Sequence, residues 1–146
     1  MITTSITRSA LLGIALSAST VATAEPMQYE IDPNHTYPTF EADHLGGVSL
    51  WRGKINSTSG TISLDVENSS GSVDITMDMD TIDYGHDDMN EHARSAEIFD
   101  VAQFPTATYT GELQGFTDGA PTSVDGTLTL HGVSRPVTLT VSRFLG

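Results

Sequence analysis

Apolar and polar residues alternate along much of the chain, which is the pattern of β-strands with one buried face. Two neighbouring segments, 61–67 and 72–80, show it most clearly, because each places Ile, Leu, Val or Met on one side and Ser, Thr, Asp or Glu on the other. The polar segment 68–71 between them predicts the turn of a β-hairpin. The two strands would present seven aliphatic or thioether side chains to a common interior.

Further segments with strand character recur along the chain, at 29–32, 38–44, 48–55, 106–113, 124–130 and 136–144. Gly, Pro, Asn, Asp and Ser residues separate most of them. Segment 48–55 has apolar residues on both sides, so the pattern does not assign its buried face. Short strands at regular spacing, linked by turn residues, predict a mainly β fold, either an antiparallel barrel or a sandwich.

One segment, 87–99, has helical rather than strand periodicity. Asp87 or Asp88 would supply the capping oxygen, and Glu91 is a further acid in the first turn, where backbone N–H groups lack partners. The apolar positions gather on one side, which suits packing against a sheet: Met89, Ala93, Ala96, Ile98 and Phe99. A single helix in a β-rich chain usually covers an opening, so we expect this helix near the mouth of any cavity.

The first 24 residues have the pattern of a secretory signal peptide. Arg8 precedes a short apolar run, and Ala22-Thr23-Ala24 is a small-residue cleavage pattern. Residues 25–146 would then form one domain in an exported protein. They hold all 19 acidic residues and every basic residue except Arg8, which gives a formal charge of −14. Such acidity disfavours nucleic acid or an anionic lipid surface as the main partner.

Residues able to carry metal or catalytic chemistry are present, but their spacing matches no known site. The best metal candidates are His86, Asp87, Asp88 and His92, with Asp43 and His44 as a second group. None fits a zinc or EF-hand spacing, and nucleophile-elbow and phosphate-loop motifs are absent from the sequence. The sequence contains no cysteine, so it can form no disulfide. We therefore predict no cofactor, no metal site and no catalytic residue.

A series of short motifs, in order, resembles the YceI-like family of exported polyisoprenoid-binding proteins. The matching positions are 29–35 (YEIDPNH), Phe40, His44, 60–62 (GTI), 74–80, 92–95 (HARS), 99–101 (FDV), 104–109 (FPTATY) and 126–137 (GTLTLHGVSRPV). The resemblance implies a periplasmic protein with a lipocalin-like antiparallel β-barrel, whose apolar cavity holds the tail of an isoprenoid quinone or polyprenyl lipid. Family members usually continue for several more strands, so we expect a C-terminally truncated, incompletely closed barrel over residues 25–146.

An isoprenoid chain carries no charge, so its site requires apolar side chains and space. The candidate ligand-binding residues are Phe40, Ile62, Leu64, Ile75, Met77, Met79, Phe99, Tyr109, Leu128 and Leu139. For each of them ordinary core packing is the competing interpretation. Two other functions stay open: a ligand-free structural or stress-response interaction protein, and a lipid-modifying enzyme that uses Tyr109 with a nearby histidine. Oligomeric state also stays open, with a homodimer among the alternatives.

Overall fold

Two antiparallel sheets make up the fold in the computed structural model, which describes residues 25–145. The predicted signal segment 1–24 lies outside the described residues. The larger sheet has the strand order β1-β4-β5-β7-β8-β9, and the smaller sheet has the order β2-β3-β6. The strands are β1 (Met27–Glu30), β2 (Thr39–His44), β3 (Ser49–Ile55), β4 (Thr58–Asp65), β5 (Ser70–Asp78), β6 (Ile82–Asp83), β7 (Thr106–Gln114), β8 (Ser123–Leu130) and β9 (Val133–Thr140).

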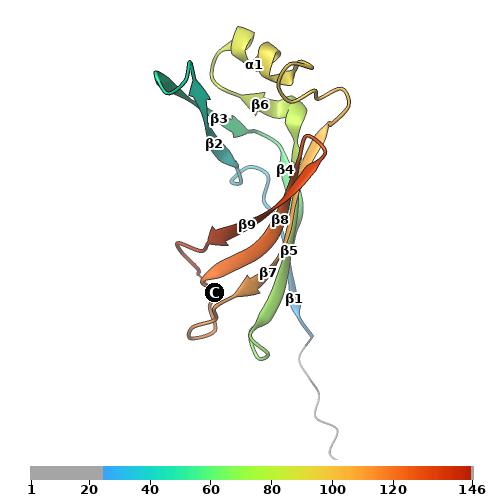
Figure 1. Cartoon of the computed structure of the whole chain (residues 1–146). Helices are drawn as coiled ribbons and strands as arrows, with labels where there is room; N and C mark the ends of the chain where they lie inside the picture. Colours follow the sequence, from blue (N-terminus) through green and yellow to red (C-terminus); the bar gives the residue numbers. More distant parts are fainter. Residues whose placement is uncertain (1–24, 146) are drawn as a thin grey trace, which may run out of the picture.

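The larger sheet is curved, with β8 and β9 turning toward the side on which the smaller sheet lies (Figure 1). Its registers collect the apolar residues on that concave face. Ile75 on β5 lies opposite Tyr109 on β7, which lies opposite Leu128 on β8. Because side chains of paired residues project to the same face of a sheet, the alternation seen in sequence becomes one continuous apolar surface.

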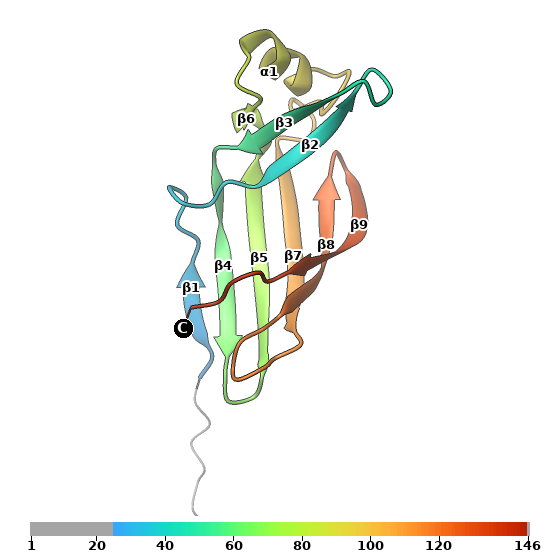
Figure 2. The same cartoon turned by 90° about the vertical axis from the view of Figure 1, so that its left-hand side faces the viewer.

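The smaller sheet crosses above the concave face (Figure 2). Its inner side carries Phe40 from β2 and Ile55 from β3, and Ile55 is almost fully buried, at 3% exposure. Gly53 lies opposite Phe40 in the register, and a Cβ at this position would fall 2.6 Å from the Phe40 ring. The absence of a side chain at Gly53 thus lets the ring lie across β3. The sequence did not assign the buried face of β3. In the structure this face carries Trp51, Gly53 and Ile55, which alternate along the strand on the side of Phe40.

The single α-helix of the described residues, α1, spans Asp87–Arg94 and ends five residues earlier than predicted. Its N-cap is His86, whose Nδ1 accepts a hydrogen bond from the Met89 N–H, so the predicted Asp87 or Asp88 cap is wrong. At the C-terminal end of α1, the Ser95 hydroxyl donates a hydrogen bond to the His92 carbonyl oxygen. The backbone of Ser95 is extended, so the helix does not continue. Residues up to Phe99 then form turns, not helix, because serine bonds locally to the backbone. A short 3-10 helix, η1 (Met79–Thr81), connects β5 to β6.

Strand β9 starts three residues before the predicted 136 and ends at Thr140 instead of 144. The preceding turn is only His131-Gly132, and both residues have positive φ, of 50° and 71°. This backbone suits the two-residue hairpin turns that match strand twist.

The prediction of a mainly antiparallel β fold with one helix is confirmed. Within residues 25–145 the two sheets remain separate, and no helix is long and apolar enough to cross a membrane.

Candidate functional site

A large apolar cavity lies between the concave face of the larger sheet and the β2 segment that crosses it. Its volume is about 840 Å³, within the roughly 300–1,000 Å³ of typical small-molecule sites. Strands β5, β7, β8 and β9 form one wall, the segment 35–42 forms another, and η1 and Phe99 lie at the helix end. The lining is His35, Thr36, Tyr37, Pro38, Thr39, Phe40, Glu41, Ala42, Ile55, Ile75, Met77, Met79, Phe99, Ala107, Tyr109, Leu128, Leu130, Val137 and Leu139.

Eight of the ten residues predicted to contact a ligand line this cavity: Phe40, Ile75, Met77, Met79, Phe99, Tyr109, Leu128 and Leu139. The other two, Ile62 and Leu64, share the same face of the larger sheet but do not line the cavity. Leu64 is 5% exposed and belongs to the packed core with Leu113 and Val124. The concave face is therefore divided into an open apolar part and a filled part.

Several lining residues were not among the predicted ones. Leu130 and Val137 continue the alternation of Leu128 and Leu139, so strict period-two counting could have found them. The irregular segment 35–38 has no periodicity that points into a cavity. Its contribution comes from the position of β2 across the sheet, which depends on tertiary structure.

Tyr109 combines an apolar contact with a structural hydrogen bond. Its ring lies over Gly126, where a Cβ would be 2.6 Å from the Tyr109 hydroxyl oxygen. The hydroxyl lies 3.1 Å from the carbonyl oxygen of Val124 and 2.9 Å from that of Val137, and donates to these two strands. Burial, with a smaller contribution from the nearby Asp125 carboxylate, raises the pKa of Tyr109. The hydroxyl is thus engaged with backbone, while the ring faces the cavity.

Polar groups lie at the rim near residue 35. The Asp32 carboxylate is 2.6 Å from Nδ1 of His35, and both side chains are exposed. Hydrogen bonds from His35 and from the Asn34 backbone lower the pKa of Asp32. Tyr37 and Leu139 remain nearly half exposed at the cavity, at 45% each. Within residues 25–145, no three His, Asp or Glu side chains are placed to hold a metal ion together. The site offers an apolar interior with a polar edge.

Aromatic side chains connect the cavity to the helix end and to the β2–β3 hairpin. The Phe40 ring lies 6.4 Å from Phe99 and 5.4 Å from Tyr84 between ring centroids. Tyr84 in turn lies 6.2 Å from Trp51. All three contacts are edge-to-face, the geometry that aromatic pairs prefer. Burial raises the pKa of Tyr84.

Asp83 holds this region together through its carboxylate. It accepts hydrogen bonds from the Gly85 N–H at 2.7 Å, the Asn90 side chain at 3.2 Å and the Asn56 side chain at 3.3 Å. These bonds, with that from Gly85 the largest cause, lower the pKa of Asp83. The carboxylate therefore ties β6 to α1 and to the end of β3.

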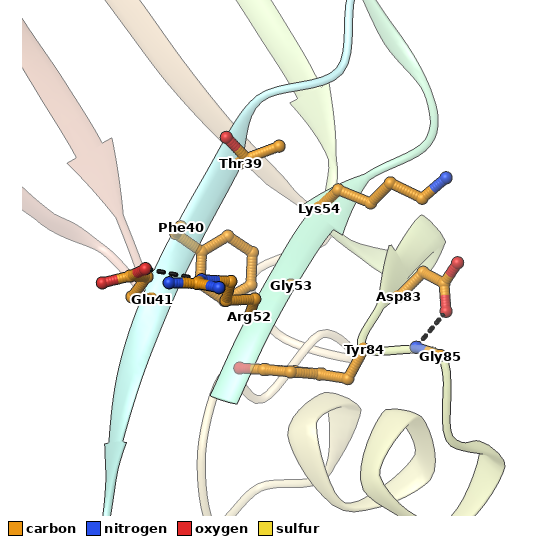
Figure 3. Close-up of a pocket in the computed structure, with 9 residues that line it drawn as sticks. All are labelled: Thr39, Phe40, Glu41, Arg52, Gly53, Lys54, Asp83, Tyr84 and Gly85. Carbon is orange, nitrogen blue, oxygen red and sulfur yellow. Dashed lines mark hydrogen bonds and ion pairs between the residues drawn. The ribbon is translucent and has the colours of Figure 1, made fainter. Parts of the chain in front are cut away.

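A second hollow, of about 740 Å³, lies on the outer side of the smaller sheet (Figure 3). Charged side chains project there, and the Arg52 Nε donates to Glu41 at 2.7 Å. The Arg52 side chain is 79% exposed, so this pair contributes little to stability. Lys54 points away from the other side chains, and its Nζ lies 5.2 Å from the Tyr37 ring centre. This hollow is a solvated surface feature, and the apolar cavity is the candidate site.

Comparison with known proteins gives a family match over almost the whole described chain. The model of the YceI-like domain matches residues 29–146. Protein YceI of Salmonella arizonae is 36% identical over 134 residues, which cover 88% of this chain and 69% of that relative. Protein YceI of Salmonella heidelberg has the same identity and coverage.

Solved structures with similar folds include Burkholderia cenocepacia BcnA and the Campylobacter jejuni YCEI protein. BcnA aligns with a TM-score of 0.56 at 21% identity, covering 70% of this chain and 63% of that structure. The Campylobacter protein aligns with a TM-score of 0.56 at 24% identity, covering 75% of this chain and 64% of that structure. This chain thus spans slightly less than two thirds of the length of either structure. At these identities the likeness concerns the fold.

Proposed function

The chain belongs to the YceI-like domain family, and on this premise we propose that its cavity binds the isoprenoid chain of a quinone or polyprenyl lipid without covalent attachment. The observation that carries the proposal is the apolar cavity of about 840 Å³ on the concave face of the larger sheet. The protein would act as a carrier or reservoir of such a lipid in the periplasm, which is the destination that the family resemblance implies for an exported chain.

Apolar contact alone can supply the affinity that such a ligand needs. Burying one CH₂-sized group contributes about 0.8 kcal/mol, so four five-carbon units contribute roughly 16 kcal/mol before the costs of ordering and association. That gross figure is already close to the practical limit of non-covalent affinity. Met77 and Met79 suit a flexible chain, because unbranched thioether side chains adapt to irregular shapes.

The arrangement of polar groups gives the ligand a direction. The polar lining residues His35, Thr36, Thr39 and Glu41 all belong to the segment 35–42. The opposite wall, on β5, β7 and β8, contributes Ile75, Met77, Ala107, Leu128 and Leu130, together with the ring of Tyr109. We place the hydrocarbon chain against this wall and any polar head group beside the segment 35–42, where it keeps access to water.

The first test asks whether the protein carries a lipid at all. Protein purified from its native compartment would be extracted with organic solvent, and the extract analysed by mass spectrometry for prenyl lipids. Uptake of ubiquinone from detergent would be measured in parallel by quenching of Trp51 fluorescence and by co-elution on gel filtration. We expect a prenyl lipid in the extract and uptake of the quinone. Failure of both would reject the proposal in favour of a ligand-free role for this fold.

A matched pair of leucine variants tests where the chain binds. Leu128 lines the cavity, whereas Leu64 lies on the same face in the packed core. Leu128→Ala should weaken ubiquinone binding by about tenfold or more, because up to three carbon contacts of about 0.8 kcal/mol each are lost. Leu64→Ala should lower the free energy of unfolding by about 2–5 kcal/mol and leave the affinity of the folded protein nearly unchanged. The opposite ranking of affinities would place the ligand elsewhere.

A further inference from the structure

The tip of the β2–β3 hairpin is the most exposed apolar surface within a single turn of the described chain. Leu45, Val48 and Leu50, which we call the hairpin tip, are 72%, 77% and 60% exposed. They lie within six consecutive positions, with Gly46-Gly47 between the first two. In both views the hairpin extends beyond the larger sheet, away from β1 and β4 (Figures 1 and 2). Exposed apolar side chains that lie together are a feature of protein and membrane interaction sites.

The other tight turns of the fold have a different composition. The β4–β5 turn consists of Val66-Glu67-Asn68-Ser69, and the β8–β9 turn is His131-Gly132. At the hairpin tip, in contrast, Leu45 has a left-handed backbone with φ of 58°. Asn or Gly would adopt this conformation at lower energy. Leu45 is therefore unfavourable at this position for two reasons: its backbone is left-handed, and its apolar side chain is exposed to water.

The hairpin is less acidic than residues 25–146 taken as a whole. Residues 25–146 have a formal charge of −14, whereas the range 39–55 contains Glu41, Asp43, Arg52 and Lys54 and is neutral overall. Two of the five basic residues in 25–146 lie in this hairpin. An approaching surface with phosphate groups would meet little repulsion from the neutral hairpin itself, because charge further than a Debye length away is screened.

We propose that the hairpin tip docks on the surface of a lipid bilayer, with its three aliphatic side chains inserted at the headgroup boundary. The choice of a bilayer as partner rests on the proposed function, because a prenyl lipid must be taken from or delivered to a membrane. It also rests on continuity with the site: Thr39–Ala42 at the base of the same hairpin line the cavity. The aromatic contacts from Phe40 through Tyr84 to Trp51 join the two regions.

Trp51, the single tryptophan of the sequence, lies beside the hairpin tip and provides a native probe. Vesicles of phosphatidylcholine that contain no isoprenoid lipid would be titrated against the protein. Binding would be measured by flotation and by quenching of Trp51 emission with brominated phosphatidylcholine. Because these vesicles contain no isoprenoid lipid, docking is measured separately from the proposed function, which the detergent uptake of ubiquinone tests. All variants keep the same N-terminal residues, so any contribution from 1–24 is common to them.

The two turn valines form a matched pair. Val48→Asp at the hairpin tip should weaken vesicle binding by about tenfold or more, since it removes one inserted aliphatic side chain and adds a charge. Val66→Asp makes the same change in the β4–β5 turn, where Val66 is 51% exposed, and should leave vesicle binding unchanged. Leu45→Asn should also weaken docking while favouring the left-handed backbone, so a loss of binding by this variant cannot be ascribed to unfolding.

Three results would overturn the proposal. They are absence of vesicle binding by the unmodified protein, equal binding by the Val48→Asp and Val66→Asp proteins, and docking onto a purified protein partner through this tip without any affinity for vesicles. Normal ubiquinone uptake combined with any of these results would leave the cavity function standing and reject only the docking surface.

Discussion

Tyr109→Phe removes one hydroxyl and leaves the ring in the cavity wall. In the structure that hydroxyl is shared between the carbonyl oxygens of Val124, at 3.1 Å, and Val137, at 2.9 Å, so it connects β7 to β8 and to the edge strand β9. A net intramolecular hydrogen bond contributes about 0.5–1.5 kcal/mol. Tyr109 is only 5% exposed, so water cannot readily replace the lost donor. We expect a loss of about 1 kcal/mol in the free energy of unfolding near pH 7.

The pH dependence of this loss tests whether the Tyr109 hydroxyl is buried in the folded protein. Burial raises the pKa of Tyr109 above the ordinary value of about 10. A raised pKa means that the stabilisation is fully present below the ordinary value and is lost as the pH rises through the folded-state pKa. The phenylalanine variant has no proton to lose at this position. The stability difference between the two proteins should therefore shrink above about pH 10 and then reverse.

The measurement is urea unfolding followed by circular dichroism at a series of pH values from neutral to alkaline. Tyr29→Phe is the control, because the Tyr29 ring is 44% exposed and its hydroxyl contacts only the Met27 sulfur in the described structure. Its effect should stay within about 0.5 kcal/mol, as for ordinary surface changes. Equal unfolding free energies for the two variants at pH 7 would refute the hydrogen-bond argument. A difference at Tyr109 that does not change with alkaline pH would refute the burial of its hydroxyl.

Two further changes test other polar groups. The Thr58 hydroxyl is 1% exposed and has no hydrogen-bond partner among the described residues, so Thr58→Val should stabilise the fold by about 1 kcal/mol in urea unfolding, and a destabilisation would reveal an unseen partner. Asp83→Asn should loosen α1 and β6, measured as faster amide exchange at Asn90. Because hydrogen bonds lower the pKa of Asp83, its stabilisation is present above about pH 4 and lost as the pH falls below it, so the two proteins should converge in acid.

The one-sided strands were predictable from sequence because period-two alternation reports directly on burial. Ile75, Met77 and Leu128 were assigned to one interior, and the registers of β5, β7 and β8 bring them to one face. The sequence also indicates Tyr109 as a candidate ligand-binding residue. It gave no indication that the hydroxyl would reach two neighbouring strands, because that contact requires Gly126 to lie beside the ring.

Local chemistry explains the wrong boundaries. The helical pattern continued through Ile98 and Phe99, but the Ser95 hydroxyl bonds to the His92 carbonyl and ends α1 at Arg94. The Phe99 N–H then donates to the Ala93 carbonyl across the turn. At the β8–β9 hairpin the sequence predicts a turn over 131–135, whereas the observed turn is only His131-Gly132. A histidine at positive φ is uncommon, so sequence alone favoured the looser connection.

The division of the concave face into a cavity and a packed core was beyond sequence reasoning, because it depends on cross-strand register. Gly111 and Gly126 lie opposite each other in the same row as Val73, so two strands contribute no side chain there. The Tyr109 ring leans over Gly126 into this gap. Leu64, Leu113 and Val124 pack together on one side of the row, and Ile75, Met77 and Leu128 line the cavity on the other. A one-residue slip in β8 would turn Gly126 to the opposite face and remove this boundary. The boundary of the cavity therefore depends on a diagonal contact between a large aromatic residue, Tyr109, and a glycine on the next strand, Gly126. Alternation within single strands does not contain this relation.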